Sequence, residues 1–458
     1  MRPFFSLLII FLCAFPLFSL DLPSNQIPDD SMLRIKTEKT WLRESPNKVF
    51  QMRPAIHVLE SGSRVEIRCE EGKDEFMVIF SHELMSGTIS DNGTIAVQRG
   101  GTGQFPGWAQ GSWMLTRNKR DGKGTLIRIF PRSDPQTYVQ LRPANNEKCV
   151  MDVIAYGGYL IRSMTIGVPF DFLYTMPVND VFKLAGPAFP RRYFDPIPEN
   201  YTSTRRLISQ IRDRTGPLEF YDDGAIDENG DYVFIATLEK QTQKNKGLNC
   251  SGFTKWLIDG ILRPVTGSRL LIQDIKAPFG DRGSSFTDRW EESEDPFFGL
   301  DWIRNLAAAA NSALRSPVYA ALDEFEVRND YFSAVQISEN SNYFIQPYPG
   351  FLDNAGYGAE GLFPLLYTLA IDNPFSFYLA AVNTESGAPI TQNNPRGAPR
   401  LRKYYHVAAL FPYFNEAGAF RIAVFESAAE TSFTGFRSRY KGQYINLVQI
   451  PVANTFDP

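Results

Sequence analysis

One stretch of the chain, residues 249–261, constrains the fold more than any other. It has the sequence Asn-Cys-Ser-Gly-Phe-Thr-Lys-Trp-Leu-Ile-Asp-Gly-Ile, and Asn249 is a residue type that caps the N-terminus of a helix well. After the cap, apolar residues recur at helical spacing on one face, and Lys255 and Asp259 lie outside that face. The stretch therefore predicts a packed helix whose first turn contains Cys250.

The position of Cys250 favours reactivity of its thiol. The first turn of a helix has backbone N–H groups without helical acceptors and carries the positive end of the helix dipole. Both features favour the thiolate, which is the nucleophilic form. A small, buried and inert cysteine is the alternative. His406 is the only histidine downstream of Cys250, and its imidazole could take the thiol proton and later protonate a leaving amine.

The sequence Asn249-Cys250-Ser251-Gly252-Phe253, followed by an apolar helix, resembles the Asp-Cys-Ser-Gly-aliphatic signature of NlpC/P60 cysteine peptidases. These are papain-like enzymes that cut peptidoglycan stem peptides. The strand that starts His406-Val407-Ala408 is similar to the family's His-Val-aliphatic strand, and residues 231–234 resemble its Tyr-Val-aromatic stretch. The chain departs from the family in three ways. It has Asn249 where the family usually has Asp, it lacks the Gly-Gly pair that usually follows the Tyr-Val-aromatic stretch, and the gap between Cys250 and His406 is longer than the family norm.

The resemblance implies that Cys250 is the nucleophile, that His406 is the base and then the acid, and that a polar residue on the next strand orients the imidazole. A four-residue turn at 415–418 would place Ser427 opposite His406, whereas an odd residue count would bring Glu426 there. A carboxylate holds an imidazolium better than a hydroxyl does, so we favour Glu426. A solvated charge at the strand end is the alternative interpretation of Glu426.

On the substrate side, Tyr232 is a candidate for lining the site, with a position in the core as the alternative. Ser251 is the second substrate-binding candidate, because backbone N–H groups at Cys250 and Ser251 would form the oxyanion site. We expect no metal, since no His/Cys grouping has zinc spacing, and no cofactor. The acidic stretch 227–231 lacks the end ligands of a calcium loop and predicts a plain turn.

The N-terminus has the pattern of an export signal over residues 1–20. Arg2 precedes a short apolar run, and Ser19 offers a small residue for cleavage. The run is too short to predict a membrane span, and no later segment is apolar enough to be one. We expect a protein of the periplasm or cell envelope. The net charge of −4 gives no reason to expect nucleic acid as a partner.

The rest of the chain divides into three parts. Residues 31–185 predict one or two small all-β modules, and the stretches 40–46 and 59–65 within them loosely resemble bacterial SH3-like wall-binding modules. Residues 186–200 contain four prolines and suit a linker or an extended chain. Residues 201–458 form the hydrolase-like part, whose long insert at 263–400 we expect to cap the site or to decorate the far face.

Three cysteines remain after removal of a signal. In an oxidising compartment, pairs of cysteines tend to form disulfides, so we expect a disulfide between Cys69 and Cys149 and a free Cys250.

The fold class that we predict is α+β: a papain-like core with the cysteine-bearing helix on an antiparallel sheet, preceded by the β modules. The expected function is hydrolysis of peptidoglycan peptide bonds. A catalytically inactive wall-binding relative and an acyl transferase or thioesterase on the same core are the alternatives.

Overall fold

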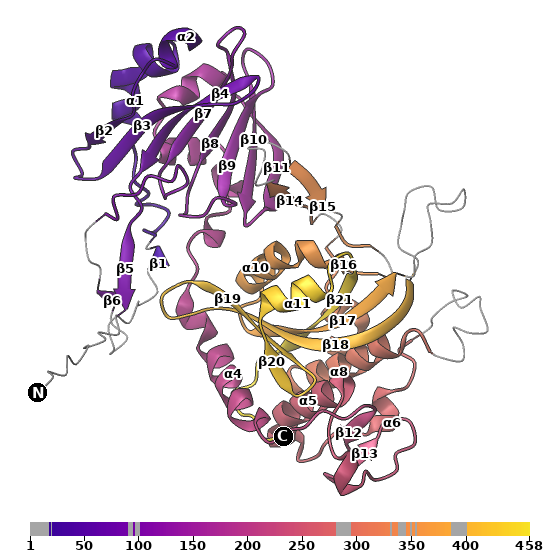
Figure 1. The fold of residues 1–458 in the computed structure, drawn as a ribbon. Coiled ribbons are helices and arrows are strands. Elements are labelled where there is room, and N and C mark those ends of the chain that lie inside the picture. Colours follow the sequence, from indigo (N-terminus) through magenta and orange to yellow (C-terminus); the bar gives the residue numbers. More distant parts are fainter. Residues whose placement is uncertain are drawn as a thin grey trace, which may run out of the picture. The chain divides into compact units, whose positions relative to one another are not determined.

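The computed structural model divides the chain into two compact units (Figure 1). Unit 1 contains Met1–Ile154 and Leu160–Phe194, and unit 2 contains Ala155–Tyr159 and Asp195–Pro458. The structure describes residues 18–19, 21–89, 95–96, 101–280, 295–329, 332–337, 345–348, 350–352, 355–385 and 401–458. Apart from Phe18–Ser19, the predicted export signal therefore lies outside the described residues. Within them, no helix is both long and apolar enough to cross a bilayer.

Unit 1 is built on a meander of eight antiparallel strands. Their order in the sheet is β11-β10-β9-β8-β7-β4-β3-β2. The strands are β2 (Ala55–Val58), β3 (Arg64–Glu71), β4 (Glu75–His82), β7 (Trp113–Asn118), β8 (Gly124–Ile129), β9 (Tyr138–Pro143), β10 (Cys149–Ala155) and β11 (Gly158–Ile166). The region thus contains one continuous sheet rather than two modules, because β7 to β10 extend the sheet that β3 and β4 begin.

Short elements complete unit 1. A small sheet consists of β1 (Phe18–Ser19), β5 (Ser86–Ile89) and β6 (Ile95–Ala96). The helices are α1 (Ser31–Thr37), η1 (Glu38–Leu42), α2 (Pro46–Val49), η2 (Phe170–Tyr174), α3 (Val178–Lys183), η3 (Gly186–Ala188) and η4 (Arg191–Tyr193). Residues 31–42, at the start of the stretch predicted as all-β modules, are helical. The proline-rich segment 186–200 contains 3₁₀ turns and is not the extended chain that was one of its two expected forms.

The predicted disulfide is also wrong, since Cys69 and Cys149 are both free thiols. Cys69 lies on β3 and Cys149 on β10, and β4, β7, β8 and β9 separate these two strands in the sheet. A disulfide needs Cα atoms within roughly 7 Å, which strands so far apart in a sheet do not provide. Burial raises the pKa of each of these thiols to about 11, so neither has the character of a reactive cysteine.

Unit 2 has a six-stranded antiparallel sheet in the order β16-β21-β17-β18-β19-β20. Its strands are β16 (Tyr357–Gly358), β17 (Ser376–Glu385), β18 (Leu401–Phe414), β19 (Phe420–Glu426), β20 (Ala429–Thr431) and β21 (Tyr444–Pro451). The hairpins β12 (Gly224–Ile226) with β13 (Tyr232–Phe234), and β14 (Ala334–Ile337) with β15 (Ile345–Tyr348), also belong to this unit. Mixed α and antiparallel β structure confirms the coarse α+β prediction.

Helices cover both faces of this sheet. The helices of unit 2, in its described part, are η5 (Pro198–Tyr201), α4 (Thr202–Thr215), η6 (Gln243–Asn245), α5 (Cys250–Thr266), α6 (Ile272–Ile275), α8 (Phe298–Leu314), η7 (Pro317–Ala320), α9 (Leu322–Phe325), η8 (Ala359–Gly361), α10 (Leu362–Asp372) and α11 (Phe433–Arg439). Tyr367 of α10 contacts the rings of Phe414 and Phe420, while α5 and α8 pack on the face that Val407 and Phe425 share.

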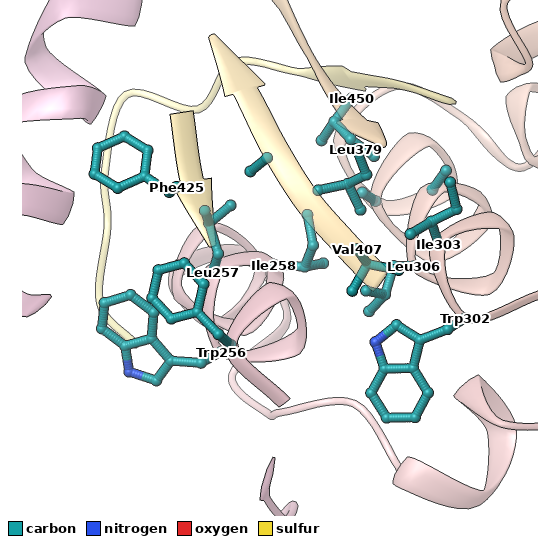
Figure 2. Close-up of a cluster of buried hydrophobic side chains, with 14 of the residues drawn as sticks. Trp256, Leu257, Ile258, Trp302, Ile303, Leu306, Leu379, Val407, Phe425 and Ile450 are labelled. Atoms are coloured by element: carbon teal, nitrogen blue, oxygen red, sulfur yellow. The ribbon is translucent and has the colours of Figure 1, made fainter. Parts of the chain in front are cut away.

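The main core of unit 2 lies between that second face and the helix pair α5 and α8. Figure 2 shows the meeting point, where Leu257 and Ile258 of α5 and Ile303 and Leu306 of α8 approach the strand residues. Every second residue of a strand points to the same face, and burying each such side chain contributes roughly 1.5–3 kcal/mol. The helix predicted to carry the nucleophile is therefore anchored along its length.

The segment 263–400 is not a separate cap in its described part. It supplies α8, which packs on α5, and β17, which pairs with both β18 and β21 at the centre of the sheet. Helix α8 begins at Phe298 and ends at Leu314. In its described part, the segment therefore contributes to the core of unit 2.

Candidate active site

The N-terminus of α5 is fixed by a cap and by a close approach to β12. The Asn249 side-chain oxygen accepts a hydrogen bond from the Gly252 N–H at 2.8 Å, which confirms the predicted N-cap. The Asn249 N–H donates to the Gly224 carbonyl at 3.0 Å. A Cβ on Gly252 would lie 2.0 Å from the same carbonyl oxygen, so only glycine fits there. Cys250 is held in the first turn by these contacts.

The body of α5 is buried on more than its apolar face. Lys255 and Asp259 lie outside that face, yet both are buried, and their side chains form an ion pair of 2.6 Å within the helix. The Ser251 carbonyl accepts a hydrogen bond from the Trp302 indole N–H of α8 at 2.9 Å. The start of α5 is therefore tied to both β12 and α8.

The register of β18 and β19 decides which residue faces His406. Phe414 pairs with Phe420, and the loop between them, 415–419, has five residues. The assumed four-residue turn is therefore wrong. The ladder ends with Ala409 opposite Phe425, so Glu426 comes next to Ala408 and shares a face with His406. An odd residue count was expected to bring Glu426 directly opposite His406; the register instead places Glu426 two residues from that position, on the same face of the sheet.

Glu426 connects His406 to two further elements. Its Oε2 lies 2.7 Å from the Nε2 of His406. Its Oε1 accepts a hydrogen bond from the Thr431 hydroxyl at 2.8 Å and forms an ion pair with the Arg439 guanidinium. Because Glu426 is buried, it is not the solvated strand-end charge that was the alternative. The ring of Tyr440 stacks on the His406 imidazole, with centroids 5.4 Å apart and an angle of 27° between the planes.

The thiol of Cys250 faces the same imidazole. Burial acts to raise the pKa of Cys250, but a hydrogen bond from His406 and its charge oppose burial, together with the Val407 N–H and the Ser251 side chain, and the net pKa is lowered. The β18–β19 ladder ends before Val407, which leaves its N–H facing α5. Since Glu426 engages Nε2, the ring nitrogen left for the sulfur is Nδ1.

The structure thus brings four of the predicted site residues together: Cys250, Ser251, His406 and Glu426. The N–H groups of Cys250 and Ser251 belong to the first helical turn, where no helix carbonyl accepts them, so they are available to an oxyanion. Tyr232 has other contacts. Its ring carries the Lys246 ammonium at 4.5 Å and packs against the apolar core of unit 2.

Ser427 has a structural position that differs from the one considered for it. Ser427 and Ala428 form the two-residue turn between β19 and β20, with φ values of 48° and 66°. Two-residue hairpin turns with positive φ at both positions favour Asn-Gly, and a non-glycine pair there is strained. The turn brings Thr431 back beside Glu426, which is how β20 contributes to the site.

Three residues of the site were missed in the sequence: Thr431, Arg439 and Tyr440. Arg439 is the last residue of α11 and Tyr440 follows it. Burial raises the pKa of Tyr440, the neighbouring Arg439 opposes this effect, and the Cys250 charge adds to it, which places the phenol within electrostatic reach of the thiol. No motif marks these residues, because their roles come only from the packing of α11 against β19. No cluster of metal-binding side chains occurs in the described part of the chain.

Comparisons with known proteins give one match. Residues 23–193 match the model of a domain of unknown function, DUF8515. This match covers less than half of the chain and ends before Cys250, so it carries no information about the site. No curated protein matches the sequence, and no solved structure matches the fold.

Proposed function

We propose that this protein is an exported cysteine peptidase or amidase that hydrolyses peptide bonds of peptidoglycan. The observation that supports the chemistry best is the chain of contacts from the lowered-pKa thiol of Cys250 through His406 to Glu426. A nucleophile, a base within hydrogen-bond reach and a group that orients the base are the parts that nucleophilic acyl transfer needs. The proposed export depends on the N-terminal sequence pattern.

The first half of the reaction forms a thioester. The Cys250 thiolate attacks the carbonyl carbon, and the N–H groups of Cys250 and Ser251 stabilise the oxyanion. When the tetrahedral intermediate collapses, the carbon–nitrogen bond breaks and the His406 imidazolium gives its proton to the departing amine. The acyl group is then bound to the sulfur, and His406 is neutral.

The second half of the reaction releases the acid. Neutral His406 takes a proton from water as the water oxygen attacks the thioester carbonyl carbon. Collapse of the tetrahedral intermediate then breaks the carbon–sulfur bond, which releases the acid and leaves the Cys250 thiolate beside the His406 imidazolium. Glu426 keeps the imidazole in one orientation through both halves, since its carboxylate accepts from Nε2–H while Nδ1 exchanges the proton with the reactants.

The substrate class in this proposal comes from the resemblance of residues 249–253 and of the His406 strand to NlpC/P60 peptidases. Peptidoglycan stem peptides contain the amide bonds that such a thiol would attack. The alternatives are a wall-binding protein without activity and an acyl transferase or thioesterase, and each predicts a different result with purified cell wall.

The test is mass spectrometry of purified peptidoglycan after incubation with the wild-type protein, with Cys250→Ala and with Cys149→Ala. We expect new peptide fragments with the wild type and none with Cys250→Ala. Cys149→Ala is the control and should also give fragments, because the Cys149 thiol that it removes has a raised pKa. If all three proteins bind the wall and none releases fragments, the peptidase proposal is wrong and the inactive relative is favoured. A thioacyl adduct on Cys250 without wall cleavage would instead favour acyl transfer.

A further inference from the structure

The residues Arg439 and Tyr440 close a ring of contacts around His406. Arg439 forms an ion pair with Glu426, and its guanidinium lies over the ring of Tyr440 at 5.6 Å, where it acts to lower the pKa of the phenol. The ring of Tyr440 in turn lies over the imidazole to which Glu426 is bonded. The imidazole is thus held at its edge by a carboxylate and on its face by a phenol ring, and one guanidinium joins these two partners.

We propose that Arg439 is a positioning residue of this active site, which holds Glu426 and Tyr440 together and thereby fixes the plane of the His406 imidazole. The inference rests on the proposed Cys250–His406 chemistry. It adds a residue, Arg439, that fixes the geometry of the site and contributes a positive charge to it. Arg439 acts through other side chains and has no contact with the reacting atoms in this role.

The helix that carries Arg439 is built to hold it in place. Ser432 caps α11, its hydroxyl accepting from the Gly435 N–H at 3.1 Å, and Phe436 is fully buried. The ring of Phe436 packs edge to face on Tyr440 at 4.9 Å. Because both ends of the helix are anchored, Arg439 reaches Glu426 from a fixed backbone, and less side-chain entropy is lost than for a free surface arginine.

The charge of Arg439 has a consequence beyond geometry. A positive group near the site favours the thiolate of Cys250, and its removal raises the pKa of groups around it. The charged and titratable groups that face this part of the site are His406, Glu426, Tyr440 and the exposed Tyr405, whose hydroxyl donates a hydrogen bond to the Gln443 side-chain oxygen. Loss of Arg439 leaves the Glu426 carboxylate without its cationic partner. The rise of Cys250 reactivity with pH should therefore occur at higher pH.

Arg437 provides a matched control on the same helix. It is exposed, and its guanidinium lies over the ring of Phe433 at 6.0 Å. Arg437→Gln removes the same charge from α11 two residues away without touching the ring of contacts. A general effect of charge on the surface of α11 would appear in both variants, whereas a positioning role predicts an effect of Arg439 alone.

The experiment measures alkylation of Cys250 by iodoacetamide between about pH 5 and pH 10 in the folded full-length chain, with mass spectrometry of the Cys250 peptide as the readout. We expect Arg439→Gln to move the midpoint upward by roughly half a pH unit, which slows alkylation near pH 6 by about threefold. Arg439→Lys keeps the charge and should keep the midpoint. It cannot join Glu426 and Tyr440 in the same way, so kcat on peptidoglycan fragments should fall about tenfold with KM unchanged.

The outcomes separate this inference from the proposed function. If Cys250 of the wild type titrates at or above about 8.5, the Cys–His chemistry itself fails. If the wild type titrates lower but Arg439→Gln and Arg437→Gln both follow its profile, Arg439 has no positioning role. Should Arg439→Gln fail to fold, Arg439→Lys decides the question, since wild-type kcat in that variant would overturn the inference.

Discussion

His406 and Glu426 lie on neighbouring strands, two residues out of direct register, and Nε2 of the imidazole is 2.7 Å from the carboxylate Oε2. The relationship depends on the five-residue loop 415–419, because one residue fewer would turn Glu426 to the other face of the sheet. It also determines the direction of the imidazole. With Nε2 occupied, Nδ1 points to the thiol of Cys250, and the strand pairing has thus defined both sides of the base.

Glu426→Gln should lower kcat by roughly 10–100-fold, and Glu426→Ala should lower it further. The amide keeps the shape of the side chain but loses the charge that stabilises an imidazolium and that binds Arg439. Steady-state kinetics on peptidoglycan fragments would measure this change. Glu430→Gln is the control, since Glu430 lies in the same hairpin and pairs with Arg212 at 2.7 Å. Equal losses in both variants would contradict an orienting role.

Gly252→Ala should destabilise the protein by roughly 3 kcal/mol and abolish the reactivity of Cys250. The added Cβ would meet the backbone of Gly224 at 2.0 Å, which can yield only if the start of α5 moves away from β12. Gly260→Ala on the same helix is the control, because its Cβ would meet the side chain of Phe456 near the chain end. Urea denaturation and alkylation of Cys250 would compare the two. A Gly252→Ala variant as stable and as reactive as the wild type would show that the contact at Gly252 is not required.

The sequence predicted the parts of the fold that local patterns determine. The cap at Asn249 and the strand that contains His406, β18, agree with the structure because capping and alternation are local signals. The all-β prediction for residues 31–185 was wrong at its start. The structure makes this region helical, and Arg34 bonds Asp30 one turn earlier and the carbonyl of Tyr174 far along the chain.

The candidate site was predictable to the same extent. Cys250 and His406 lie in recognisable strings of residues, whereas Glu426 could be chosen only by guessing the parity of a loop. Arg439 and Tyr440 had no signal at all, because an arginine after a short helix has many equivalent interpretations until the packing of α11 on β19 is known. The role of the segment 263–400 was likewise hidden, since strand order within a sheet is a long-range property.

The buried pair Lys255–Asp259 leads to a further prediction about stability. Burial lowers the pKa of Lys255 and raises that of Asp259, each opposed by the charge of the other. Asp259→Asn keeps the hydrogen bond from the Leu270 N–H but leaves a buried ammonium unpaired, and should cost about 3–5 kcal/mol. The double variant Lys255→Met/Asp259→Leu should be close to wild type by urea denaturation. A single variant as stable as wild type would mean that Lys255 reaches solvent.

Because the His82 imidazole is buried in unit 1, we expect this unit to lose stability at mildly acidic pH. The imidazole is buried at the end of β4, with its Nε2 at 3.8 Å from Oδ2 of Asp30, and among the described residues neither atom has a hydrogen-bond partner. Burial lowers the pKa of His82, Asp30 and Asp29 oppose this, Arg34 adds to it, and the net direction is downward from 6.5. Near pH 6 the His82 imidazole is therefore protonated more in the unfolded chain than in the folded chain.

The sign of this linkage determines the experiment. Above about pH 7 the imidazole is neutral in both states and contributes nothing, whereas below about pH 6.5 the unfolded state gains protons and unit 1 loses up to about 1.4 kcal/mol per pH unit. His82→Gln should remove this part of the slope, and His57→Gln, on the edge strand β2, should retain it. Native-state hydrogen exchange of the β4 and β7 amides at pH 7.5 and 5.5 measures the difference. If His82→Gln and the wild type lose equal protection on acidification, the buried imidazole is not the cause, and the carboxylates of the unit account for the whole effect.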